Sequence, residues 1–552
     1  MIARPQPRWA YSPIIIIINN NRGCWMRCNA MRWMAAASLA ALALLPTVAT
    51  AQPKVLRYAS AFDPQTMDPH ALTLQYHSRV VTQIYEGLVN RDQQFRLEPS
   101  LALSWAPLDA KTWRFKLRPG VKFHDGSAFT ADDVVFSIAR ALQPTSQRAA
   151  QLRGVLGARK VDTLTVDLQL SDPDAILPEK LWLIAMMSKS WSEKHQVTKP
   201  QDYNAKQETH AVRQAMGTGP FMLKQYEADV RTTLVAHPAW WGRATHPGNL
   251  DEAQYQVIQS DATRLAALRS GQVDFVIDPP FQDVARLRQD PGLKLLETAD
   301  IGTQYLAFDQ HREELAGSNI QGRNPFKDLR VRRAVYLAID MDLIARQVLR
   351  GQAVSTGSPV ASLVDGYLPA LERRPAADPA AARALLKEAG YPQGFSTSMD
   401  CVNVSYRQAV CQAITAMLEK VGIKASLIAS PSSLFFPKLS QATGSLLEYG
   451  WTPGGDAWNV LNSLVRSHGP AAGAFNAGRY SNSRLDNLID AIATEPDLAL
   501  RRQRVGEALN LMRADLPLLP LYRIKHSWVM RPQVQVVQWP NSVLELRWVK
   551  VE

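Results

Sequence analysis

The side chains that could do chemistry are spread thinly along this chain of 552 residues. Its ten histidines are scattered, and no two stand at the i, i+4 spacing with which one helix face binds zinc. The short motifs of P-loop, dinucleotide-binding, serine-hydrolase and zinc-protease sites do not occur. We therefore expect no enzyme, no catalytic residue, no metal site and no cofactor. A secreted hydrolase with a triad assembled from distant residues is the alternative.

Two cysteines have a spacing that suits a disulfide. Cys401 and Cys411 enclose nine residues, and a bond closing so short a loop contributes about 2–3 kcal/mol. Such a bond requires an oxidising compartment. We expect the pair to be oxidised, with two buried free thiols as the alternative.

The N-terminal segment predicts export into such a compartment. Arg32 precedes an apolar run over residues 35–45, and Ala49-Thr50-Ala51 forms a cleavage site of small residues. Residues 1–51 are therefore interpreted as an extension plus a signal peptide that is cleaved after Ala51, and the protein is expected in the periplasm. A buried helix rich in alanine and leucine is the alternative.

The net charge does not indicate a nucleic-acid partner. The full chain has 62 basic and 50 acidic residues, or +12, but residues 1–51 contain five arginines and no acid. The remaining +7 is dispersed over 501 residues and is interpreted as a solubility charge. Composition and compartment together exclude nucleic-acid binding.

The hydrophobic pattern alternates between strand-like and helix-like periods, which is typical of an α/β protein. Thr130 and Asp133 carry the signature of a helix N-terminus. Strands are expected at residues 55–59, 112–117, 164–170 and 274–277. Helices are expected at residues 134–142 and 379–389, with a helix pair within 328–349. A further helix is expected to be capped by Asp261-Ala262-Thr263 and to end at Gly271.

Several tryptophans stand beside glycine or proline, as in Gly450-Trp451 and Trp539-Pro540. Most such side chains pack in a core. Aromatic rings held on loops nevertheless suit a cleft that encloses a small solute, because they supply contact area at a low cost in conformational entropy.

Five segments together resemble the extracellular solute-binding proteins of peptide/nickel-type ABC importers, the dipeptide- and oligopeptide-binding class. They lie in the order typical of that family and span nearly the whole chain after Gln52. The segments are TWRFKLRPGVKFHDGSAFTADDVVFSIAR (112–140), YEGLV (85–89), GTGPF (217–221), DLRVRRA (328–334) and YGWT (449–452).

This resemblance implies an α/β, two-lobed periplasmic-binding-protein fold of the cluster C type, with a hinge between the lobes. Lobe I would comprise residues 52–304 and 526–552, with an extra subdomain at about 95–210, and lobe II residues 305–525. The implied partners are a solute and, transiently, an ABC permease with its ATPase subunits. We expect a monomer; a two-lobed sensor that docks onto a membrane receptor is an alternative.

The resemblance also locates the ligand-binding residues, but two of them differ here. Dipeptide binders of the family hold the ligand amine with an aspartate three residues after the tryptophan of the Gly-Trp motif, where this chain has Gly454. They hold the carboxylate with an arginine at the position of Ser405. Asp456 and Arg407 are the nearby candidates to replace them, although Asp456 would equally suit a turn.

The ligand therefore stays open between two classes. A peptide or peptide-like solute is the first expectation, by analogy with the family; an opine-like conjugate, a sugar or a metal complex is the alternative. The candidate ligand-binding residues are Trp451, Asp456, Arg407, Tyr406, Asn403, Tyr76, Tyr305 and Asn476.

Overall fold

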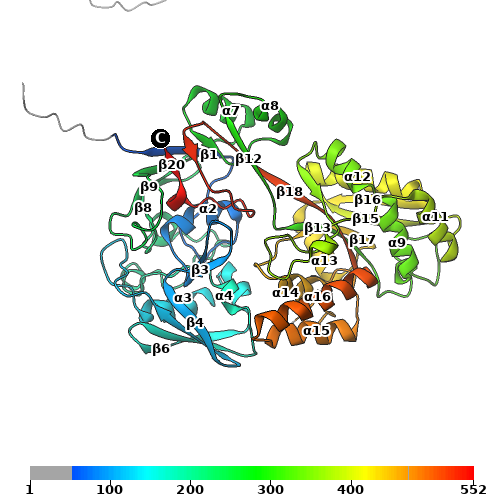
Figure 1. Cartoon of the computed structure of the whole chain (residues 1–552), viewed down its shortest axis with the longest axis horizontal. Coiled ribbons are helices and arrows are strands. Elements are labelled where there is room, and N and C mark those ends of the chain that lie inside the picture. The colour runs from blue at the N-terminus through cyan, green and yellow to red at the C-terminus, as the bar shows by residue number, and fades with distance from the viewer. Residues whose placement is uncertain (1–51, 470–471) are drawn as a thin grey trace, which may run out of the picture. The chain divides into compact units, whose positions relative to one another are not determined.

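The computed structural model of the chain describes residues 52–469 and 472–552. The predicted signal peptide and its cleavage site, in residues 1–51, lie outside the described residues. Strands and helices alternate through the described part (Figure 1), which confirms the α/β class. None of the helices in this part has both the length and the apolar character needed to cross a bilayer.

A twelve-stranded sheet runs through both lobes, and the long strand β18 (Leu518–Met530) belongs to each of them. Its first half pairs with β13 (Thr303–Phe308) and β14 (Ala353–Ser355). Its second half pairs with β12 (Lys294–Ala299) and β11 (Phe275–Val276). We use lobe I for the part built on β1 and β8 to β12, and lobe II for the part built on β13 to β17. The chain thus crosses between the lobes twice, between β12 and β13 and within β18.

Lobe I has a parallel centre, because β1 (Val55–Ser60) pairs in parallel with both β10 (Glu252–Val257) and β11. Antiparallel strands β9 (Arg231–Ala236) and β8 (Phe221–Glu227) extend it. Its other strands are β2 (Val89–Arg91), β3 (Leu97–Pro99), β19 (Val534–Gln535) and β20 (Lys550–Val551). Its helices are α2 (Gln75–Ile84), α4 (Leu177–Lys180), α5 (Lys189–Lys194), α6 (His210–Arg213), α7 (Asp261–Ser270) and α8 (Val284–Arg288).

Within lobe I, a separate four-stranded antiparallel sheet forms a smaller layer with helix α3 (Ala131–Ala141). The capping box predicted at the start of this helix is present, with reciprocal bonds between Thr130 and Asp133. A hydrophobic cluster that includes Phe115, Ile138 and Leu168 joins the helix to the sheet. The strands follow in the order β4 (Ala102–Asp109), β5 (Thr112–Leu117), β7 (Thr165–Leu170) and β6 (Val155–Asp162).

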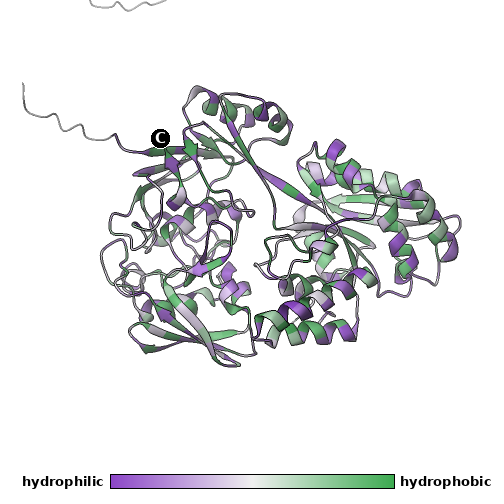
Figure 2. Ribbon diagram, in the orientation of Figure 1, coloured by the Kyte–Doolittle hydropathy of each residue, from purple (hydrophilic) through white to green (hydrophobic). Residues whose placement is uncertain are grey.

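Lobe II is built on three mutually parallel neighbours, β16 (Ile423–Ser430), β15 (Phe395–Val402) and β17 (Leu446–Trp451). Helices cover this sheet, and the alternation of hydrophobic and hydrophilic colour along them marks their buried and solvent faces (Figure 2). They are α9 (Leu329–Ala338), α10 (Met341–Leu343), α11 (Pro379–Glu388), α12 (Ser405–Glu419), α13 (Ser432–Gln441), α14 (Ala457–Val460), α15 (Ser483–Thr494) and α16 (Leu498–Asp515).

Most local predictions are confirmed, and one is corrected. The strand at 112–117 and the helix ending before Gly390 occur as expected. The N-cap of α7 is Ser260, whose hydroxyl accepts a bond from the Thr263 amide, and not Asp261. The predicted helix pair within 328–349 is present: α9 ends where the chain leaves the helical conformation at Ile339, and the second segment is the short α10 continued by a π-helical turn over Ile344–Val348.

Candidate functional site

The carboxyl ends of the three parallel strands of lobe II meet at one edge of the sheet. In open α/β sheets this edge is where ligands bind, because the segments that leave the strands diverge there. Asn403 follows β15 directly, and its amide donates to the Ser430 carbonyl at the end of β16. Trp451 ends β17, and Tyr406 lies in the first turn of α12.

Lobe I presents the corresponding edge after β1 and β11. Phe62 follows β1, and half of its surface is exposed (51%). Asp278 follows β11 and accepts bonds from both terminal nitrogens of buried Arg79, at 3.0 and 3.1 Å, and another from the Ser60 hydroxyl. Arg79 holds the pKa of Asp278 below its usual value although burial acts in the opposite direction. This closed network fixes the edge and leaves Phe62 as its exposed apolar group.

Three aromatic pairs lie at these two edges. Phe62 stacks on Tyr76, with ring centroids 5.3 Å apart. Trp451 packs at 4.7 Å against Phe475, which is 37% exposed, and its indole N–H donates to Asn459 at 2.8 Å.

The third pair joins the lobes. Phe281, which follows β11 in lobe I, lies 5.7 Å from Tyr406 in lobe II, measured between ring centroids. The two edges therefore meet at aromatic side chains. Such a surface can enclose a solute with stacking and apolar contact, whatever charge the solute has.

Arg407 is already held by a buried carboxylate. Its Nε and one terminal nitrogen donate to the same Glu448 oxygen at 3.0 and 2.7 Å, and Glu448 has no exposed surface. Burial raises the pKa of Glu448, and the guanidinium of Arg407 opposes that rise. Cys401 and Cys411 form the expected disulfide beside this pair, so it ties the end of β15 to α12. Arg407 thus has a structural partner, and its role in holding a ligand carboxylate stays a prediction.

Asp456 is also engaged within the protein. Its carboxylate caps α14 by accepting from the Trp458 amide at 2.7 Å, and it accepts from Arg501 at 2.8 Å. Only 2% of the residue is exposed. The same guanidinium donates to the Ala175 carbonyl of lobe I, at 3.3 Å. The contacts of Asp456 are those of a helix cap in a network that links the lobes; a contact with a ligand amine stays a prediction.

The burial of Asp456 makes stability depend on pH. Burial raises the pKa of this carboxyl to about 6, against the attraction of Arg501. The folded protein then binds a proton that the unfolded chain releases near pH 4, so the free energy of unfolding falls as pH rises from about 4 to 6. The Asp456→Asn variant, which retains a capping oxygen, should lack this component, worth up to about 3 kcal/mol. Chemical denaturation of both proteins at pH 4, 5, 6 and 7 measures it; parallel curves would contradict the assignment.

Two further candidates are enclosed by the protein. Tyr305 has no exposed surface, and its hydroxyl donates to the Pro359 carbonyl at 2.5 Å. Asn476 is 2% exposed and binds the main chain on both sides of its loop, including the Tyr480 amide and carbonyl. The two residues therefore support β13 and the loop that carries Phe475. Their contact with a ligand stays a prediction.

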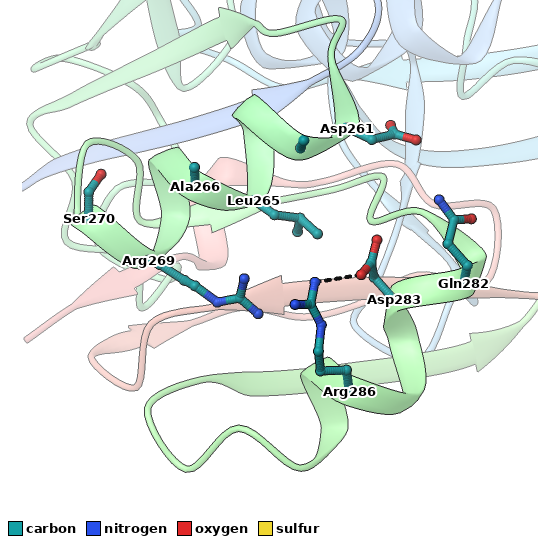
Figure 3. Close-up of a pocket in the computed structure, with 9 residues that line it drawn as sticks. Asp261, Leu265, Ala266, Arg269, Ser270, Gln282, Asp283 and Arg286 are labelled. Carbon is teal, nitrogen blue, oxygen red and sulfur yellow. Dashed lines mark hydrogen bonds and ion pairs between the residues drawn. The ribbon is translucent and has the colours of Figure 1, made fainter.

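A pocket of a different kind lies between α7 and α8 of lobe I (Figure 3). Two arginines and two aspartates surround it, and Arg286 is paired with Asp283 at 2.5 Å. Arg269 lies 3.7 Å from Asp290. Because its charges are balanced by ion pairs and it shares no residue with the two strand edges, we do not assign the solute site to it.

Reasoning from the sequence missed three aromatic side chains of the candidate site. Phe62 and Phe475 lie in loops and have neither glycine nor proline as an immediate chain neighbour. Phe281 begins a short 3₁₀ helix and follows Pro280. A search for aromatic residues within a few positions after each expected parallel strand would have found the first two. Phe475 comes from a distant loop, and nothing local marks it.

Comparison with known proteins identifies the family of this chain. The family model of bacterial extracellular solute-binding proteins, family 5 (middle), matches residues 96–471. The chain belongs to this family. The match spans both lobes and includes Phe281, Tyr406, Trp451 and the disulfide, whereas Phe62, Tyr76 and Phe475 lie outside the matched residues.

Curated relatives of the family cover most of the chain. A heme-binding protein A of Haemophilus influenzae is 27% identical, over 80% of this chain and 81% of its own. A glutathione-binding protein of Pectobacterium atrosepticum is 28% identical, over 88% and 91%. A dipeptide-binding protein of Escherichia coli is 27% identical, over 89% and 92%.

Solved structures show the same fold. HbpA2 from Haemophilus parasuis superposes with a TM-score of 0.78 at 24% identity, covering 90% of this chain and 100% of that one. The Helicobacter pylori ABC transporter-associated periplasmic binding protein in complex with the peptide STSA superposes with a TM-score of 0.69 at 22% identity, covering 90% and 98%. The family's two-lobed architecture is thereby confirmed for this chain.

Proposed function

We propose that the protein is the periplasmic solute-binding component of an ABC importer, and that it captures a peptide or peptide-like solute for delivery to a membrane permease. The observation that carries the proposal is the placement of three aromatic pairs at the carboxyl ends of strands from both lobes, one of which joins Phe281 to Tyr406. The dipeptide- and glutathione-binding relatives, which cover about nine tenths of the chain, support the solute class.

Capture follows from a difference in affinity between two arrangements of the lobes. Hinge motion needs short connections, and in the described part of the chain the backbone crosses between the lobes at two places, the link between β12 and β13 and the middle of β18. A solute that contacts Phe62 and Tyr76 on one side and Trp451 and Phe475 on the other binds the closed arrangement more tightly. It shifts the population toward that arrangement by this difference in affinity, and the closed form is the one presented to the permease.

The solute is held with few charges of the protein. Gly454 offers no side chain, and Arg407 and Asp456 are each paired with a buried or half-buried partner inside the protein. A free dipeptide buried without counter-charges would lose several kcal/mol of solvation at each end. We therefore infer a peptide-like solute whose terminal charges stay in water, or are blocked by a covalent group.

A matched peptide panel tests this proposal. Di-, tri- and tetrapeptides, their N-acetylated and C-amidated forms, and glutathione are added to the mature protein, and thermal unfolding and titration calorimetry are followed. A solute at a hundred times its Kd stabilises the protein by about 2.7 kcal/mol. Blocking either terminus of the best peptide is expected to change Kd by less than threefold. A loss of more than a hundredfold on blocking would show a charge clamp, and no response to any peptide would refute the peptide class.

A flat metal complex is the second candidate, because aromatic pairs without free counter-charges also suit the faces of a planar apolar solute. The heme-binding relative supports this alternative. Titration with hemin, followed by the shift of its absorption band, distinguishes the two. A saturable band shift that the Trp451→Ala variant lacks, in a protein without response to peptides, favours the metal complex.

A further inference from the structure

We propose that lobe II has a second binding site, for an amphipathic organic anion with a carboxylate or phosphate head and an apolar body. It is a cavity of about 600 Å³, which we call the arginine pocket. Its four arginines come from three separate elements: Arg333 from α9, Arg373 and Arg374 from the segment after the 3₁₀ turn Pro369–Leu371, and Arg513 from α16.

The arginines of the arginine pocket form no ion pair with the described part of the chain. No aspartate or glutamate lines it, and among the described residues no carboxylate oxygen lies within 4.0 Å of a nitrogen of these four side chains. The pocket between α7 and α8 differs in this respect, because Arg286 there is paired with Asp283 (Figure 3). Four guanidinium groups around one cavity repel each other, and a bound anion would remove that repulsion.

Arg374 gives the clearest indication of a missing partner. One terminal nitrogen donates to the Pro520 carbonyl, while the other is buried and makes no hydrogen bond to any residue that the structure describes. Its guanidinium lies 4.4 Å from the centre of the Tyr336 ring. Burial lowers the pKa of Arg374, and Tyr336, Asp342 and Asp340 oppose that shift. A desolvated guanidinium with a free N–H forms strong bonds with carboxylate or phosphate oxygens.

The rest of the arginine pocket is apolar, which sets the second half of the ligand's chemistry. Its lining includes the leucines of three helices and of β18, with one methionine: Leu337, Leu385, Leu509, Met512 and Leu518. This volume lies within the range of small-molecule pockets. A hydrocarbon or aromatic body would lie on this surface while the head group reached the arginines. An inorganic anion would contact the arginines but not the apolar surface.

The arginine pocket is independent of the proposed solute site. It shares none of the aromatic residues at the strand edges, so its proposed ligand is distinct from the transported solute. Arg333 and Arg513 are exposed at its rim and can be replaced without leaving a buried charge unpaired. Arg374 is half-buried and bonded to the Pro520 carbonyl, so its replacement also affects folding.

Titration calorimetry on the mature protein tests the proposal with octanoate, octyl phosphate, inorganic phosphate and octanol. We expect saturable 1:1 binding of octanoate or octyl phosphate, and at least tenfold weaker binding of inorganic phosphate and of octanol. Tighter binding of octanoate than of octyl phosphate indicates a ligand with a carboxylate head group, and the reverse order indicates a phosphate. The Arg333→Gln/Arg513→Gln double variant should bind at least tenfold more weakly, with an unchanged melting temperature.

Two control variants keep the experiment decisive. Arg269→Gln/Arg286→Gln, in the charge-balanced pocket of Figure 3, removes the same charge and should not change the affinity. Trp451→Ala should leave anion binding unchanged, although it weakens binding of the transported solute. Equal affinity for octanol and octanoate, or an equal loss in both double variants, would overturn the arginine pocket. Loss of anion binding in Trp451→Ala would place the anion at the solute site instead.

Discussion

Replacement of Arg407 by methionine is expected to lower the free energy of unfolding by about 3–5 kcal/mol, because it leaves the Glu448 carboxylate buried and unpaired. Glu448 has no exposed surface, and Arg407 supplies its two shortest charged contacts, at 2.7 and 3.0 Å. From the described residues, a long bond of 3.5 Å from the Tyr522 hydroxyl would remain to its side chain. Urea denaturation of the oxidised mature protein, followed by circular dichroism, measures the change.

A double variant separates this structural role from a role in binding. Arg407→Met with Glu448→Gln removes both charges and should recover most of the lost stability, since no buried charge is left uncompensated. If Arg407 serves only the fold, the double variant should bind the best solute of the peptide panel within threefold of the unaltered protein. A single variant that loses less than 1 kcal/mol would contradict the importance of the pair. A double variant that is stable but binds a hundredfold more weakly would show that Arg407 contacts the ligand.

Replacement of Trp451 by alanine is expected to weaken solute binding by about thirtyfold or more, which corresponds to a side chain worth at least 2 kcal/mol. The indole is half-buried, packs at 4.7 Å against Phe475 and is fixed in orientation by its bond to Asn459. A preorganised aromatic surface of this kind contributes most to affinity, because little entropy is lost on binding. Titration calorimetry with the best solute measures the change.

A second variant lies in lobe I, and a control variant lies in the separate four-stranded sheet. Phe62→Ala should also weaken binding, by about tenfold, since Phe62 is exposed and stacked on Tyr76 in lobe I. Trp105→Ala removes a half-buried tryptophan of β4, which is remote from both strand edges in sequence and in strand pairing, and should leave affinity unchanged. Binding within threefold in both the Trp451 and the Phe62 variants would refute the proposed site.

The local elements could be predicted because their causes are local. The alternation of apolar residues over 112–117 and the reciprocal cap of Thr130 and Asp133 depend on neighbours within a few positions, and the structure has both. The disulfide was also predictable, since only two cysteines follow Ala51 and they lie close in sequence. The N-terminus of α7 was misplaced by one residue because Ser260 and Asp261 are both good capping residues, and side-chain geometry selects between them.

The environment of the candidate site residues could not be predicted in the same way. Asp456 caps the short helix beside it, which its sequence neighbours permit, but the Arg501 that pairs with it is 45 residues away. Arg407 and Glu448 are 41 residues apart and meet only because parallel strands β15 and β17 are neighbours. The spacing of residues along the sequence does not reveal such distant partners. A side chain with an ion-pair partner therefore cannot be distinguished in the sequence from one without a partner.

The sequence by itself determined the class of the protein: its motifs identify the two-lobed scaffold and the solute-binding family, and its periodicity determines most of the secondary structure. Tertiary structure decided which side chains are available to a solute. It paired Arg407 and Asp456 internally and exposed Phe62 and Phe475. It also gathered four arginines from three elements into one pocket, where they form no ion pair with the described residues. The physical reason is that family membership and helical or strand period depend on the order of residues along the chain, whereas charge compensation and burial depend on long-range packing.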